Sequence, residues 1–232
     1  MTNRLEFNTG VIKPLECYRE AWELLKPHFW ILFAITIVGV MISSATLYIL
    51  GGAMMCGIMY CYLLAIEGNE PKFEDLFRGF AYWKAGLFVV AVMIIPTMIV
   101  MLGTYLPIIA AAVMGQRMSQ EELWSFLAGV FVVEFIMTVI MVCIHTLLLF
   151  AFPIVVDQNL SGWSSMKLSA RSVWANLQGV AGLWVVGFFV SLAGLLVFCV
   201  GVYFTIPIII GAHMVAYRKI FPGTLSTAEA VA

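Results

Sequence analysis

The sequence predicts an all-α integral membrane protein with six transmembrane helices, because its composition is very apolar and it contains four long runs almost free of charge. Of the 232 residues, 63% are hydrophobic and 11% are charged, and the mean hydropathy is +1.03. A soluble domain carries about 25% charged residues to cover its surface. A chain with less than half of that share has too little polar surface to enclose its apolar residues in water. We therefore expect lipid to be its solvent.

The four apolar runs set the number of spans. They cover residues 27–66, 85–116, 123–156 and 172–217, and Glu134 is the one Asp, Glu, Lys or Arg inside them. Roughly 20 helical residues cross the hydrocarbon core, so the first and last runs can each hold two spans and the middle runs one each. We expect turns at Gly51-Gly52 and around Gly201, with Pro96 and Pro107 as candidate kinks. The expected spans are about 29–49, 52–66, 85–113, 123–152, 179–200 and 203–217.

The distribution of basic residues predicts the orientation. In a six-span arrangement, 11 of the 12 Lys and Arg residues fall on one side of the membrane, and the other side has only Arg117. Lys and Arg concentrate in short cytoplasmic loops. Both termini are therefore expected in the cytoplasm, and the location is expected to be the cytoplasmic (inner) membrane of a prokaryote.

Each cytoplasmic segment also has the pattern of an amphipathic helix that precedes a pair of spans. These helices are expected at about 14–26, 72–82 and 162–177, lying in the membrane interface. In the third, Trp163, Met166 and Val173 fall on one face, and Ser165, Lys167, Ser169 and Arg171 on the other. The chain thus predicts a single polytopic domain, 1–232, of three hairpins that each follow an interfacial helix, with a flexible tail at 222–232. Internal duplication and independent hairpins remain equally open explanations of this pattern.

Three stretches carry a resemblance to known proteins. They are GNEPKFEDLFRGF after the second span, PIVVDQNLSGWSSMKLS after the fourth and IPIIIGAHMVAYRKIF at the end. They resemble a loose group of poorly characterised bacterial six-helix membrane proteins, which includes the membrane domain fused to some glycerophosphodiester phosphodiesterases. The resemblance implies a six-helix fold in a bacterial or archaeal cytoplasmic membrane, and it carries no catalytic residue to this chain.

Glu134 is the leading candidate for an intramembrane polar site, since an ionisable group within a span is costly and often functional. Thr138, Met141 and His145 follow at helical spacing on the same face. With His213 in the last span, they define a hypothetical proton or cation path. The alternative, which the pattern favours, is that Glu134 is protonated or hydrogen-bonded to a neighbouring helix.

No metal or cofactor site is expected. His28, His145 and His213 lie far apart in the sequence without ligand spacing, and the five cysteines lack a CxxC pattern. Asp157, Asn159 and Trp163 after the fourth span are a candidate cytoplasmic contact, although turn and helix-start residues are expected there anyway. The chain has no nucleophile elbow, phosphate-binding glycine loop or catalytic carboxylate pair, so an enzyme is the least supported class.

Three functions remain open on the sequence. The first is a non-catalytic membrane module that acts as a subunit, scaffold or assembly factor with a membrane-protein partner or as a homo-oligomer. The second is a small-solute or ion transporter or channel with Glu134 in its pathway. The third is a protein that binds or organises lipids. Nucleic acid is not an expected partner, because the net charge is −1 and the pI is about 6.3.

Overall fold

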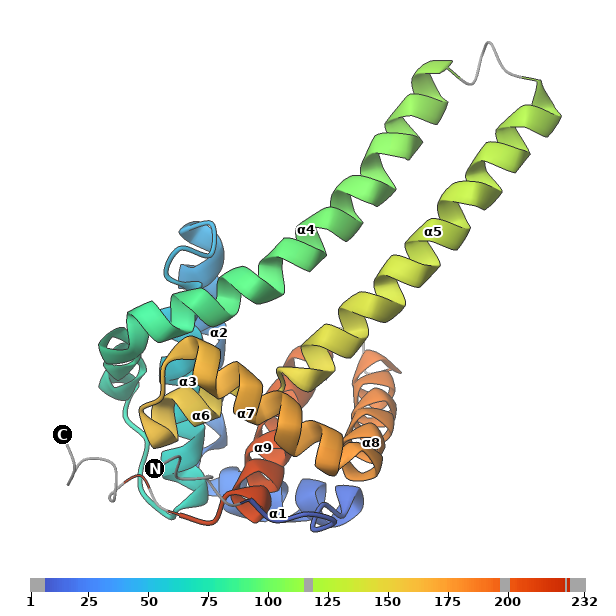
Figure 1. Ribbon diagram of the computed structural model, residues 1–232. Helices are drawn as coiled ribbons and strands as arrows, with labels where there is room; N and C mark the ends of the chain where they lie inside the picture. The colour runs from blue at the N-terminus through green and yellow to red at the C-terminus, as the bar shows by residue number, and fades with distance from the viewer. Residues whose placement is uncertain (1–6, 115–118, 197–200, 224, 226–232) are drawn as a thin grey trace, which may run out of the picture. The chain divides into compact units, whose positions relative to one another are not determined.

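The computed structural model describes residues 7–114, 119–196, 201–223 and 225 (Figure 1). Every regular element in this part of the chain is a helix, which confirms the predicted all-α class. Four helical segments of the described residues are long and apolar enough to cross a membrane: Pro14–Ala45, Phe73–Val113, Gln120–Gln158 and Leu177–Leu196. Gly51–Ile66 is a shorter apolar helix. By length and composition these helices suggest a membrane protein.

The elements follow the predicted order, with some different boundaries. They are α1 (Pro14–Leu25), η1 (Lys26–His28), α2 (Phe29–Ala45), α3 (Gly51–Ile66), η2 (Phe73–Tyr82), α4 (Trp83–Met114), α5 (Gln120–Leu147), α6 (Ala151–Gln158), α7 (Gly162–Ala175), α8 (Leu177–Leu196) and α9 (Gly201–Ile220). Pro96 and Pro107 both lie inside α4. Arg117, Cys199 and the expected end of the fifth span at 197–200 lie outside the described residues, as does most of the predicted tail.

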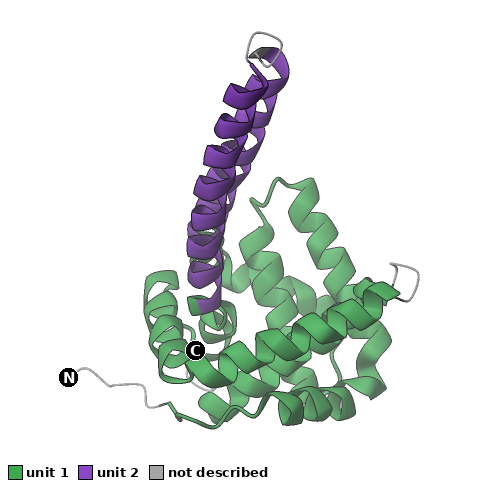
Figure 2. Cartoon of the chain, turned by 90° about the vertical axis from the view of Figure 1, so that its right-hand side faces the viewer, with its two compact units in different colours: residues 1–90, 147–232 green, residues 91–146 purple. Residues whose placement is uncertain are grey.

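The chain divides into two compact units (Figure 2). Unit 1 comprises residues 1–90 and 147–232, and unit 2 comprises residues 91–146. Unit 1 contains α1 to α3, η2, the start of α4, and α6 to α9. Unit 2 contains the remainder of α4 and nearly all of α5.

Helix α3 forms the centre of unit 1, where it packs against α2, η2, α6 and α9. Almost all of its residues are buried. Its contact with η2 depends on glycine: a Cβ atom at Gly57 would lie 1.8 Å from the Leu76 carbonyl oxygen, and one at Gly79 would lie 2.0 Å from that of Ala53. No larger residue fits at either position, so glycine sets how closely the two elements approach.

The expected turn at Gly51-Gly52 is wrong, because the chain reverses before it reaches these glycines. The turn lies at Thr46–Leu50, where Leu47 and Tyr48 have positive φ angles of 48° and 62°. Gly52 is instead in α3, where an added Cβ would lie 2.2 Å from the carbonyl carbon of Gly86 in α4. This glycine serves close helix packing rather than chain reversal.

The expected continuous span at 123–152 is also interrupted, since α5 ends at Leu147 and α6 begins at Ala151. Pro153 has no N–H to donate to Leu149, which breaks the helical ladder at this point. The hydroxyl of Ser169 on α7 satisfies the groups freed nearby: it accepts from the Phe150 N–H at 3.1 Å and donates to the Leu147 carbonyl at 2.8 Å. A side chain from another helix thus replaces the missing backbone partners.

The two faces of α7 differ from those predicted. Ser165, Ser169 and Ser172 are buried together with Met166 and Val173, so the serines face the protein rather than solvent. Trp163, Lys167, Arg171 and Trp174 are exposed instead. Small serine side chains allow α7 to pack closely, and the hydroxyls of Ser169 and Ser172 donate to the backbone carbonyls of Leu147 and Ser169.

Unit 2, purple in Figure 2, is a pair of long helices that run alongside each other in Figure 1. None of the described residues of α5 is buried. On α4, several of the half-buried residues of this unit are glycine, alanine, threonine or proline, among them Gly103, Thr104, Pro107 and Ala111. Apolar side chains that would form a core in a soluble protein are here directed outward, as expected for helices surrounded by lipid or by other helices.

Gly57→Ala is expected to lower the free energy of unfolding by about 3 kcal/mol or more, the upper end of the range for overpacked cores. The reason is the 1.8 Å approach of the new Cβ to a backbone oxygen, which no side-chain movement relieves. Thermal unfolding of the purified protein in detergent measures the effect. Gly129→Ala on α5 is the control, since its Cβ would have no neighbour within 4 Å. Equal stability of the two variants would contradict the packing of α3 on η2.

Candidate functional site

The main cluster of charged side chains in unit 1 joins the ends of three helices. We call Glu67, Asp157, Tyr217 and Arg218 the α9 hub. The two terminal nitrogens of Arg218 bond the two oxygens of Asp157, each at 2.8 Å. Arg218 Nη2 also forms an ion pair with Glu67, and the Tyr217 hydroxyl donates to Asp157 Oδ2 at 2.7 Å. The Arg218–Asp157 pair has the two-point geometry that makes guanidinium–carboxylate contacts strong.

The ends of the apolar runs supply the charged residues of the hub. Glu67 follows the last residue of α3, Asp157 lies in α6, and Arg218 lies near the end of α9. Their side chains are only 8–11% exposed. A break of such a buried pair leaves an uncompensated charge, which is strongly destabilising.

The electrostatic balance of the hub favours a charged Arg218. Burial alone would lower the pKa of Arg218, but the hydrogen bond and charge of Asp157 and the charge of Glu67 raise it above its usual value. Both oxygens of Glu67 also lie 3.1 Å from the N–H of Leu225. The carboxylates are thus engaged by a cation, a phenol and a backbone N–H.

Further contacts tie the N-terminal segment to the same end of α9. Lys219 pairs with Glu20 of α1 at 2.7 Å, and the Asn8 N–H donates to the Ile220 carbonyl at 2.9 Å. Asn176, between α7 and α8, accepts from the Gly10 N–H at 2.7 Å and donates to the Asn8 carbonyl at 3.1 Å. The side chain of Asn176 therefore holds the N-terminal segment where it crosses the α7–α8 junction.

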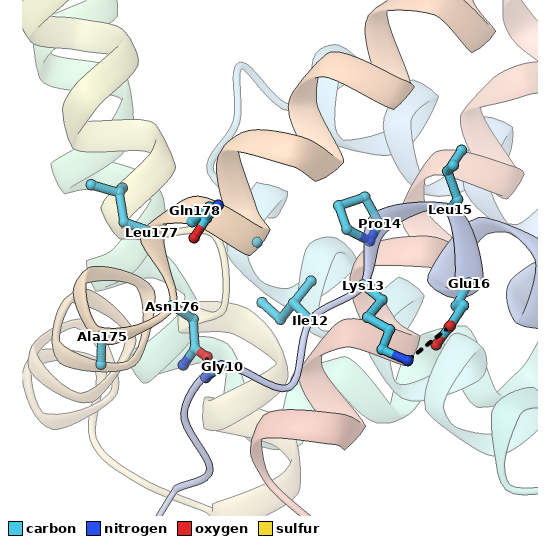
Figure 3. A pocket seen from close by; sticks show the side chains of 11 residues that line it. Gly10, Ile12, Lys13, Pro14, Leu15, Glu16, Ala175, Asn176, Leu177 and Gln178 are labelled. Carbon is cyan, nitrogen blue, oxygen red and sulfur yellow. Dashed lines mark hydrogen bonds and ion pairs between the residues drawn. The ribbon is translucent and has the colours of Figure 1, made fainter.

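A cavity of about 620 Å³ lies beside this crossing (Figure 3). Its walls come from residues 10 and 12–16 on one side and 175–179 on the other. Lys13 and Glu16 at its edge form an ion pair of 3.0 Å with each other, as the dashed line in Figure 3 marks. The exposed side chains of Leu15 and Leu177 also border it. The lining thus combines apolar side chains with the polar groups of Lys13, Glu16, Asn176 and Gln178.

Unit 2 contains three polar residues of the hypothetical proton or cation path, Glu134, Thr138 and His145, and they do not bond to one another. Glu134 Oε2 accepts a hydrogen bond of 2.8 Å from Thr104 on α4, and a Cβ atom at Gly103 would lie 2.4 Å from Oε1. Thr138 is exposed, and the His145 ring bonds within its own helix, to the Met141 carbonyl at 2.9 Å. Glu134 is thus hydrogen-bonded to a neighbouring helix, one of the two states in the alternative that the sequence pattern favours.

His213 belongs to unit 1, where its ring lies 5.9 Å from that of Trp184. Its Nε2 atom is buried and has no hydrogen-bond partner in the described chain. Among the described residues no three His, Cys, Asp or Glu side chains are grouped closely enough to hold a metal ion.

The predicted contact residues after the fourth span have separate positions. Asp157 is part of the α9 hub. Asn159 is exposed in a left-handed conformation, φ 48°, that ends α6, and Trp163 is exposed on α7. The sequence interpretation missed Glu67, Tyr217 and Arg218. A usable signal was present, because Glu67, Asp157 and Arg218 are each the first charged residue after a long apolar run.

Arg218→Met is expected to reduce the free energy of unfolding by about 3–5 kcal/mol, because Asp157 and Glu67 would lose their buried cation. Lys219→Met is the matched control, with the same change in charge at the neighbouring position. Its pair with Glu20 is more exposed and is expected to contribute under about 1 kcal/mol. Unfolding of both variants in detergent compares them, and a similar small loss in each would show that the hub does not stabilise the fold.

No protein-family model matches the chain, and neither the curated proteins nor the solved structures include a significant match.

Proposed function

We propose that the protein is a non-catalytic membrane module that acts as a subunit, scaffold or assembly factor of a membrane complex. The observation that carries this proposal is the apolar surface of unit 2. Large apolar side chains are exposed around both of its helices: Ile95, Met98, Ile99, Leu102, Tyr105, Leu106, Ile108 and Ile109 on α4, and Phe131, Val132, Val133, Phe135, Ile136, Val139 and Ile140 on α5.

Helices in a bilayer associate through close packing and interhelical hydrogen bonds rather than by exclusion from water. Unit 2 already shows one such bond, between Thr104 and Glu134, beside the small residue Gly103. Its outer faces are free to pack against helices of another protein in the same way. In the α9 hub one guanidinium faces two carboxylates, which also accept hydrogen bonds from the Tyr217 hydroxyl and the Leu225 N–H. Every carboxylate is thus engaged, which supports a stable platform rather than a reaction centre.

The transport alternative depends on Glu134. In unit 2 its hydrogen bond to Thr104 joins two adjacent helices, and Thr138, the next residue of the hypothetical path, is exposed. A path for ions needs a continuous series of polar groups. The geometry therefore favours a packing role for Glu134.

We also propose the six-span topology with both termini in the cytoplasm of a prokaryotic inner membrane, each hairpin preceded by an interfacial helix. The α9 hub supports it, because Glu67, Asp157 and Arg218 follow the second, fourth and sixth expected spans and meet in one cluster. The contact of Asn8 with Ile220 adds the N-terminal segment to the same side. The basic residues of these segments then face the cytoplasm.

A photo-crosslinking amino acid tests the partner proposal. Placed at Phe135 on α5, it is expected to give a crosslink to one defined membrane protein in the native membrane. Placed at Phe188 on α8, which is equally exposed, it is expected to give mainly lipid adducts. The measurement is mass spectrometry of the crosslinked products after gentle extraction. Lipid adducts alone at both positions would contradict a partner-binding role for unit 2.

Reporter fusions test the topology. A phosphatase that is active only outside the cytoplasm is expected to be active when fused after Ser119 and inactive when fused after Phe221. The reason is that Ser119 follows three spans and Phe221 follows six. Activity after Phe221, or inactivity after Ser119 with normal expression of the fusion, would rule out the proposed arrangement.

A further inference from the structure

Four exposed side chains form one line along α7. Trp163, Lys167, Arg171 and Trp174, which we call the α7 stripe, are separated by four, four and three residues and so lie on one helical face. The two tryptophans are 58% and 71% exposed. At a rise of 1.5 Å per residue, the stripe is about 16 Å long, and its two cations are about 6 Å apart along the helix.

The charge of the stripe is not balanced by nearby acidic residues in the sequence. Helix α7 contains no Asp or Glu, and none occurs between Gln158 and Ala228. Lys167 instead lies over the ring of Trp163, with Nζ 5.6 Å from its centroid. The basic residues at the two ends of α1 differ, since Lys13 pairs with Glu16 and Lys26 with Glu23.

The opposite face of α7 fixes the direction of the stripe. Ser165, Ser169 and Ser172 are buried against the protein, and a rotation of the helix would break the hydrogen bonds of Ser169 with Phe150 and Leu147. Helix α8 begins at Leu177, directly after α7, and is one of the segments long enough to cross a membrane. The stripe therefore belongs at the level where the chain enters the bilayer.

We infer that the α7 stripe binds the headgroup of an anionic phospholipid. Lys167 and Arg171 are close enough to contact one phosphate together, and Arg in particular offers several donors to phosphate oxygens. Indole rings prefer the membrane interface, where their apolar body and N–H group are both satisfied. An acidic protein surface would be served by the two cations but gives no reason for the flanking tryptophans. The inference does not depend on the proposed partner of unit 2.

The test uses the full chain in nanodiscs that contain phosphatidylcholine with a minority of phosphatidylglycerol. Native mass spectrometry of the released protein then counts the retained lipids. The wild type is expected to retain phosphatidylglycerol above its share of the nanodisc. Each cation near an anionic surface contributes about fivefold in binding, so Lys167→Gln with Arg171→Gln is expected to weaken retention about 25-fold.

The matched control is Lys13→Gln with Lys26→Gln, which makes the same change in net charge at residues already paired with acids. It is expected to behave as wild type, as is the charge-preserving double variant Lys167→Arg with Arg171→Lys. Retention of phosphatidylglycerol by the glutamine variant at the wild-type level would overturn the inference. So would equal losses in the α7 and control variants, or loss of an acidic protein from native extracts with unchanged lipid retention.

Discussion

The contact of Arg218 with Asp157 and Glu67 joins parts of the chain that are 61 and 151 residues apart. It is the interaction on which the arrangement of unit 1 depends, because it fixes the ends of α3, α6 and α9 to one another. In a soluble protein, apolar burial would hold three such helices together. Between helices in lipid that driving force is weak, since the lipid tails are as apolar as the side chains. A shielded ion pair with two-point geometry can then decide which helix ends meet.

Close packing at glycine residues is the second feature that holds unit 1 together. The glycines at 52, 57, 79 and 86 bring α3, η2 and the start of α4 so near that an added Cβ would overlap backbone atoms. These contacts give dispersion energy and precise registration between elements, whereas the hub selects the helix ends that meet. The two effects act on the same helix, because α3 carries two of the glycines and ends beside Glu67. This combination explains why α3 is almost wholly buried.

Run lengths and periodicity predicted the helical class and the order of the elements, because both are local properties of the sequence. The errors arose where a distant residue decides the local structure. The sequence predicted a turn at Gly52, whereas in the structure this glycine allows close contact with the backbone of Gly86. The interruption after Leu147 needed both Pro153 and the hydroxyl of Ser169, which is 22 residues away. The serines of α7 read as a solvent face, since a pattern of polarity does not distinguish water from a protein surface that offers hydrogen-bond acceptors. The hub was missed because its partners are distant in the sequence, although its charged residues lie at the ends of the runs that defined the spans.

The contacts of unit 1 form a sequence of dependencies that leads from the hub to the α7 stripe. Arg218 holds Asp157 and with it the end of α6. The start of α6 is held by Ser169, whose hydroxyl bonds on both sides of the break. Ser169 must then face inward, and this orientation turns Trp163, Lys167, Arg171 and Trp174 outward. The exposed cations of α7 are therefore a product of the same polar contacts that stabilise the fold. Because the charged groups of the hub are engaged with one another inside unit 1, the cations of α7 remain available at its surface, beside tryptophans that prefer the membrane interface.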